Sequence, residues 1–138
     1  MSGIVLTWPE SDVHPRDGEN NIYETLRSPG DRSEFYSFIH EPFGSVHDQV
    51  FVVHRADASQ YHTMVMEWTP EWMTIERDGQ IIKTIIENDD DLIPDVPHHV
   101  AMQLDAWDHE LPSPVWMNVD YIKVWSFDGY DVEPGACD

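Results

Sequence analysis

Hydrophobic and polar residues alternate along much of this chain with a period of two, which places successive side chains on opposite faces of a β-strand. The run from Tyr61 to Trp68 shows this alternation clearly. The runs Trp72 to Arg77 and Gln80 to Glu87 flank Asp78-Gly79, a pair suited to the positive φ angles of a two-residue hairpin turn. No window of helical length shows the 3.6-residue apolar period of an α-helix. The pattern therefore predicts an all-β protein.

Proline, glycine, aspartate and serine separate the chain into nine strand-like runs. The expected strands are Gly3 to Trp8, Asn20 to Leu26, Glu34 to His40, Gln49 to Arg55, Tyr61 to Trp68, Trp72 to Arg77, Gln80 to Glu87, His99 to Trp107 and Trp116 to Phe127. Strands of this length and spacing are typical of two antiparallel sheets packed face to face. In this β-sandwich, Trp68, Trp116 and Trp125 are expected to lie in the core.

Length and charge narrow the class of protein. The 138 residues suffice for one domain, which we expect to span residues 1–127, with an acidic tail at 128–138. The chain has 27 acidic and 7 basic side chains, so its formal net charge is −20. Such a surface repels phosphate backbones and anionic lipids, so neither nucleic acid nor a membrane is an expected partner.

The start of the chain lacks the basic residues and the apolar stretch of a signal peptide. No apolar run approaches the ~20 residues that span a bilayer. We therefore expect the protein to be cytoplasmic when made, and to reach the outside by lysis or on a virion. The single cysteine, Cys137, excludes both an internal disulfide and a cysteine-based metal site.

No cofactor is expected. The acidic loop from Asn88 to Pro97, with Asp89, Asp90, Asp91 and Asp95, could hold a structural calcium ion, but it lacks the spacing and the glycine of a known calcium loop. His98-His99 and His109 also suggest a metal, yet adjacent histidines on one strand point to opposite faces. No metal ligand is therefore assigned.

The segment around Glu19 carries the candidate chemistry. Period two places Glu19 and Asn21 on one strand face, and a β-bulge after Asn21 would bring Glu24 to the same face. Two glutamates brought together there could serve as the nucleophile and acid/base of a retaining glycosidase, which needs carboxyls ~5–5.5 Å apart. Spacing alone leaves the alternative that these are ordinary exposed glutamates.

Several motifs resemble glycoside hydrolase family 16, the β-glucanase and laminarinase group. Gly18-Glu19-Asn20-Asn21-Ile22-Tyr23-Glu24 after Trp8-Pro9 resembles the family's active-site strand, Glu-x-Asp-x-x-Glu. Further similar motifs follow in order: Phe38-Ile39-His40, Tyr61-His62-Thr63, Glu67-Trp68-Thr69-Pro70, Asp78-Gly79, Gln103-Leu104-Asp105-Ala106-Trp107 and Val119-Asp120-Tyr121-Ile122-Lys123-Val124-Trp125. The resemblance covers some 120 residues. It implies a concanavalin A-like jelly roll.

The resemblance also implies roles for particular residues. Glu19 would be the nucleophile and Glu24 the acid/base, with Asn21 standing where the family has an aspartate. The expected glycan-binding residues are Trp8, His40, Gln103 and Trp107. His14 replaces the second tryptophan of the family's Trp-Pro…Trp-Pro loop. The family's N-terminal strands have no counterpart here, so the jelly roll is N-terminally shortened and we expect another subunit or a partner protein to cover a sheet edge.

Two functions follow as hypotheses. The first is a retaining endo-β-1,3/1,4-glucanase-like protein directed at a β-glucan or another glycan, weakly active or inactive because Asn21 cannot ionise. The second is a non-catalytic carbohydrate-binding or assembly protein, such as a phage capsid or tail component. The glutamate pair favours the first, whereas the short chain, the acidity and Asn21 favour the second.

Overall fold

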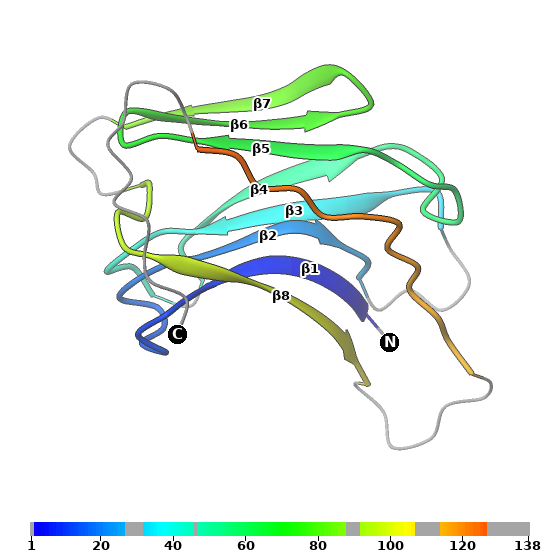
Figure 1. Ribbon diagram of the computed structural model, residues 1–138, viewed down its shortest axis with the longest axis horizontal. Helices are drawn as coiled ribbons and strands as arrows, with labels where there is room; N and C mark the ends of the chain where they lie inside the picture. Colours follow the sequence, from blue (N-terminus) through cyan, green and yellow to red (C-terminus); the bar gives the residue numbers. More distant parts are fainter. Residues whose placement is uncertain (1, 27–31, 46, 88–91, 107–113, 127–138) are drawn as a thin grey trace.

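The computed structural model describes residues 2–26, 32–45, 47–87, 92–106 and 114–126 (Figure 1). Eight strands form within these ranges: β1 (Ser2–Pro9), β2 (Glu19–Glu24), β3 (Phe35–His40), β4 (Gln49–His54), β5 (Met64–Trp68), β6 (Trp72–Arg77), β7 (Gln80–Ile86) and β8 (His98–Asp105). None of the described residues forms a helix, and so no described helix could cross a membrane.

The strands form two antiparallel sheets. The larger has the order β4-β3-β2-β1-β8 and the smaller the order β5-β6-β7, and Figure 1 shows the two as separate layers. Every pair of neighbouring strands is antiparallel. The predicted all-β sandwich of jelly-roll type is therefore confirmed, including the hairpin at Asp78-Gly79, where both residues have positive φ.

The core lies between the two sheets. Ile39 of β3 packs with Met73 and Ile75 of β6 and with Ile85 of β7, and all four are buried. These residues come from the alternate positions of their strands, as a sheet with one buried face requires. Trp68 packs against this cluster, as expected, and its indole N–H donates a hydrogen bond to the carbonyl of Pro94 (2.9 Å).

The opposite face of the larger sheet points away from β5, β6 and β7. In Figure 1 its strands arch so that the hollow side is turned away from the smaller sheet. We call this hollow side the concave face. Because Ile39 points into the core, its neighbours Phe38 and His40 point to the concave face, together with the residues that pair with them on β2 and β4.

The expected ninth strand is wrong. Residues 114–126 run across the sandwich without regular structure, as the orange segment of Figure 1 shows. Trp116 and Trp125 are 75% and 74% exposed, so neither lies in the core. The alternation of this segment is typical of a strand, but a strand also needs a hydrogen-bonded neighbour, and residues 114–126 pair with no described strand.

Candidate functional site

The β-bulge predicted after Asn21 is present in β2. Glu19 pairs with His40, Asn21 with Phe38 and Glu24 with Tyr36, and the register shifts between Asn21 and Glu24. Residues that pair directly across antiparallel strands share a face. The bulge therefore brings Glu19, Asn21 and Glu24 together on the concave face, where period two alone would have turned Glu24 to the core.

Gly18 fixes where β2 begins. Its φ is +75°, a conformation that glycine adopts without strain, and a Cβ there would lie 2.6 Å from Pro94 Cγ. Its amide also donates a hydrogen bond to the carbonyl of Pro15 (3.0 Å). Glycine at position 18 thus allows the chain to pass close to Pro94, and this path places Glu19 at the edge of the concave face.

Asn21 lies between the two glutamates and bonds to the acid/base candidate. Its Nδ2 donates a hydrogen bond to Glu24 Oε2 at 3.1 Å. Asn21 Oδ1 is buried and has no hydrogen-bond partner. Ser2 Oγ lies 3.5 Å from Glu24 Oε1 at the other side of that carboxyl.

The pKa values of the Glu19 and Glu24 carboxyls are both raised. Burial raises the pKa of Glu19, an effect that a hydrogen bond with Asn21 opposes and the negative charge of Asp105 reinforces. Burial also raises the pKa of Glu24, with further contributions from the charges of Glu19 and Asp105 and opposing hydrogen bonds from Asn21 and Ser2. The charge of Glu19 acts on Glu24, so the pair is electrostatically coupled.

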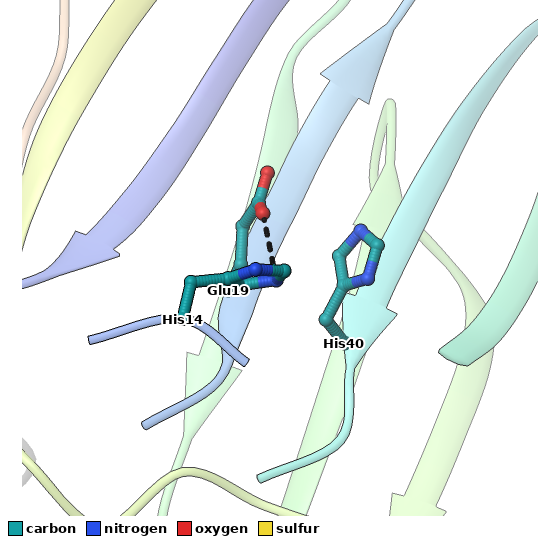
Figure 2. Close-up of side chains that lie close together, drawn as sticks. All are labelled: His14, Glu19 and His40. Atoms are coloured by element: carbon teal, nitrogen blue, oxygen red, sulfur yellow. Dashed lines mark ion pairs between the residues drawn. The ribbon is translucent and has the colours of Figure 1, made fainter. Parts of the chain in front are cut away.

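Two histidines adjoin Glu19. His14 Nε2 lies 3.3 Å from Glu19 Oε2, and His40 lies directly across from Glu19 on β3. The His14 and His40 rings meet edge to face with centroids 5.5 Å apart (Figure 2). Burial lowers the pKa of His14, and burial together with His14 lowers that of His40 to about 4.

The loop that carries His14 is held by contacts of its own. Trp8 stacks on the His14 ring (centroids 5.4 Å apart) and donates its indole N–H to Asp12 Oδ1 at 2.9 Å. Asp17 accepts hydrogen bonds from Arg16, whose Nε and Nη2 both lie 2.6 Å from its carboxylate, and from Ser11. Trp8, expected to stack on a glycan, therefore already has His14 against its ring.

A row of aromatic rings on the concave face was not expected. Tyr36, Phe38 and Phe51 share this face, and the Phe51 ring lies 5.2 Å from Tyr36 and 5.0 Å from Phe38, centroid to centroid. Phe51 is 50% exposed. We call these three residues the aromatic platform. The sequence signal for it was the alternation of side chains in the runs Glu34 to His40 and Gln49 to Arg55. This alternation places Tyr36, Phe38 and Phe51 on the same sheet face as Asn21.

The remaining sequence-predicted residues are dispersed. Gln103 lies on β8, where it pairs with Ile4, which in turn pairs with Glu24, so Gln103 shares the concave face one strand beyond β1. Trp107, His109 and Asp89 to Asp91 lie outside the described residues, while Asp95 is exposed. His98 Nε2 donates to the carbonyl of Asp17 (3.0 Å), and its Nδ1 accepts from the Thr7 hydroxyl (3.1 Å). Both of its ring nitrogens are thus engaged in the protein.

The two-sheet jelly roll thus carries Glu19 and Glu24 on its concave face. The chain is similar to the crystal structure of SCLam, a non-specific endo-β-1,3(4)-glucanase from glycoside hydrolase family 16, with a TM-score of 0.60 and 25% sequence identity. The similarity covers 72% of this chain but 39% of SCLam. No family model and no curated protein matches the chain. The chain therefore has a glucanase-like fold and spans well under half the length of that structural relative.

Proposed function

We propose that the concave face binds a β-glucan-type glycan, and that Glu19 and Glu24 hydrolyse it weakly or not at all. The observation that carries this proposal is the convergence of Glu19, Asn21 and Glu24 on one face through the bulge in β2. The aromatic platform on the same face supports it, because the apolar faces of sugar rings stack on exposed aromatic side chains. The similarity to a β-1,3(4)-glucanase supports the class of glycan.

In this proposal, Glu19 attacks the anomeric carbon and Glu24 protonates the departing glycosidic oxygen. Water then releases the sugar from Glu19, with Glu24 acting as base. Two features weaken the reaction. Asn21 supplies a neutral amide in place of the family's carboxylate, so the pair has one fewer negative charge beside it. His14 Nε2, 3.3 Å from Glu19 Oε2, also lies against the oxygen expected to attack.

The test is reducing-sugar release from mixed-linkage and β-1,3-glucans by the full chain, paired with equilibrium binding of the same glucans. We expect binding, and a slow release that Glu19→Gln abolishes. Release that survives Glu19→Gln would refute the roles of the two glutamates. Absence of binding to every glucan tested would refute the glycan proposal itself.

A second candidate function, assembly through the β8 side of the sandwich, has its own support. β8 pairs only with β1 among the described strands, which leaves its other edge without a strand neighbour. Met102 and Leu104 point to the inner side of the larger sheet and are 54% and 45% exposed. Open edges with exposed apolar residues favour pairing with another chain.

The occupant of this edge in the second candidate is another copy of the same chain, joined β8 to β8 about a two-fold axis. Two copies each carry a net charge of −20, so their repulsion must be screened for them to pair. Light scattering is therefore expected to show dimers in molar salt and monomers in dilute buffer, with Met102→Lys remaining monomeric in both. A wild-type monomer in molar salt would refute self-pairing. Placement of such an assembly in a virion stays a prediction from the sequence.

A further inference from the structure

His14, Glu19 and His40 converge from three separate segments of the chain. His14 comes from the loop after β1, Glu19 from the first position of β2 and His40 from the last position of β3. One candidate ligand atom from each lies within 4.8 Å of the other two. Figure 2 shows the Glu19 carboxylate directed at the His14 ring, with the His40 ring beside them.

Two ring nitrogens of this cluster are buried without a partner. His14 Nε2 and His40 Nδ1 are inaccessible to solvent and make no hydrogen bond. The 3.3 Å contact of His14 Nε2 with Glu19 Oε2 does not meet the geometry of a hydrogen bond, although it is within ion-pair distance. Buried polar atoms in native proteins are nearly always satisfied, so these nitrogens indicate a missing ligand.

We propose that His14, Glu19 and His40 bind a zinc ion. Two imidazole nitrogens and one carboxylate oxygen are a ligand set that zinc adopts with its fourth position open to water. Tetrahedral zinc with ligand bonds of ~2.0–2.1 Å places its ligand atoms about 3.3 Å apart. The pair His14 Nε2 and Glu19 Oε2 already has this separation, and the His40 ring must move inward by at most about 1.5 Å to reach it, from within 4.8 Å to about 3.3 Å.

The choice of zinc over calcium or magnesium follows from the donors. Calcium and magnesium prefer oxygen ligands, whereas imidazole suits zinc and its transition-metal neighbours. The surroundings favour any cation, since the chain carries a net charge of −20 and the charge of Asp105 reaches Glu19. The loop contacts of Trp8 and Asp17 hold His14 in place, which reduces the ordering cost of binding.

Zinc bound at this position would affect hydrolysis, but the proposed zinc site does not require the protein to be an active hydrolase. An ion bound to Glu19 Oε2 withdraws that oxygen from attack, so zinc-loaded protein loses hydrolysis. The aromatic platform lies outside the ligand set, and it stays available to a glycan. The site thus converts a glucanase-like face from hydrolysis to binding.

The experiment is calorimetric titration of zinc chloride into the full chain after treatment with EDTA and dialysis, with no glycan present. We expect one zinc ion per chain. His14→Phe and His40→Phe retain an aromatic ring but lose the nitrogens, and each is expected to weaken binding by about 100-fold or more, because loss of even an outer-shell partner costs about 10–100-fold. His47→Gln, which removes an exposed histidine elsewhere, is the matched control and is expected to bind as wild type does.

Circular dichroism of the two histidine variants is compared with that of wild type to verify that they fold. Glu19→Gln keeps the shape of the third ligand, so it tests the site even if a histidine variant misfolds. It is expected to weaken zinc binding as well. Cobalt substituted for zinc is expected to give the intense visible absorption of a four-coordinate site. Absence of zinc binding by wild type would overturn the proposal. Binding that is unchanged in the folded His14→Phe and His40→Phe variants would also overturn it, since other histidines would then hold the ion.

Failure of this proposal is distinguishable from failure of the glycan proposal. Zinc binding is measured without glycan, and glycan binding is measured on protein kept in EDTA. A chain that binds glucan but no zinc overturns only the metal site, and a chain that binds zinc but no glucan overturns only the glycan role.

Discussion

Asn21 Nδ2 donates a hydrogen bond to Glu24 Oε2 across 3.1 Å, so a neutral amide ties down the carboxyl expected to donate the proton. A carboxylate at position 21 could not make this bond unless it were protonated, and it would add a negative charge to a pair that is already coupled. The amide therefore favours the stability of the site over its catalytic reactivity.

Asn21→Asp is expected to raise reducing-sugar release from mixed-linkage glucan by about tenfold or more, because a charged neighbour helps to keep Glu24 protonated. The same change is expected to destabilise the fold by about 1–3 kcal/mol, since a buried donor is replaced by an acceptor. Urea unfolding and activity are measured on the same preparations in EDTA. Glu19→Gln added to Asn21→Asp should remove the gain, and a gain that persists would place the chemistry elsewhere.

Gly18 and Gly79 provide a matched pair for the geometry that presents Glu19. Both have positive φ, +75° and +81°, but a Cβ at Gly18 would collide with Pro94, whereas one at Gly79 would meet nothing within 4 Å. Gly79→Ala is therefore expected to cost about 1–2 kcal/mol for its backbone alone. Gly18→Ala is expected to cost about 1–3 kcal/mol more. The free energies of unfolding of both variants are measured by urea titration. Equal losses of stability would show that Pro94 moves aside at no energetic cost.

The fold was predictable because alternation reports directly on which strand faces are buried. Eight of the expected strands form, and the bulge after Asn21 could be placed because three polar residues could meet on one face only with one extra residue. Trp116 to Phe127 shows the limit of this reasoning. Its alternation reports a preference for a strand, but pairing depends on a neighbouring edge that the segment itself does not encode.

The site was predictable only in part. Glu19, Asn21, Glu24 and His40 were predictable because strand alternation and the family resemblance both indicated them, and the structure places all four on one face. The meeting of His14 with His40 depends on how the loop after β1 folds back, with Trp8 stacked on the His14 ring. Loop return of this kind leaves no periodic signal, so the cluster emerged only from the structure.

His54 predicts a loss of stability in acid. Its side chain is fully buried, stacks on Phe35 with centroids 4.9 Å apart, and bonds through Nε2 to Ser37 Oγ at 2.8 Å. Burial, aided by the positive charges of Arg77 and His62, lowers its pKa from the usual 6.5 to about 4. Between these values the unfolded chain takes up a proton that the folded chain refuses, so stability is full above pH 6.5 and falls as the pH drops toward 4.

The contribution of His54 to this loss is about 3 kcal/mol at pH 4, because its pKa is about 4 in the folded chain and 6.5 in the unfolded chain. Unfolding free energies of wild type, His54→Gln and the exposed control His47→Gln are compared from pH 7 to pH 4. His54→Gln is expected to be less stable at pH 7 but to lose less on acidification, while His47→Gln follows wild type. Parallel curves for wild type and His54→Gln would assign the acid sensitivity to other groups.

The aromatic platform makes the sharpest test of glycan binding, because Phe51 touches neither glutamate nor any of the three proposed zinc ligands in the contacts of the described residues. Its ring, 50% exposed, is supported by Tyr36 and Phe38, so truncation removes a stacking surface without opening the core. Phe51→Ala is expected to weaken glucan binding by about two- to tenfold, in line with the roughly 0.5–1.5 kcal/mol that an aromatic contact contributes. Phe43→Ala removes another exposed phenylalanine, 71% accessible and placed in the loop between β3 and β4, and is expected to bind as wild type does.

Both affinities are measured by titration with one glucan oligosaccharide in EDTA. Thermal unfolding of the two variants verifies that they remain folded. Equal binding by Phe51→Ala and wild type would remove the platform from the binding surface, and the glycan would then have to lie along Trp8 and Gln103 on the far side of the glutamates.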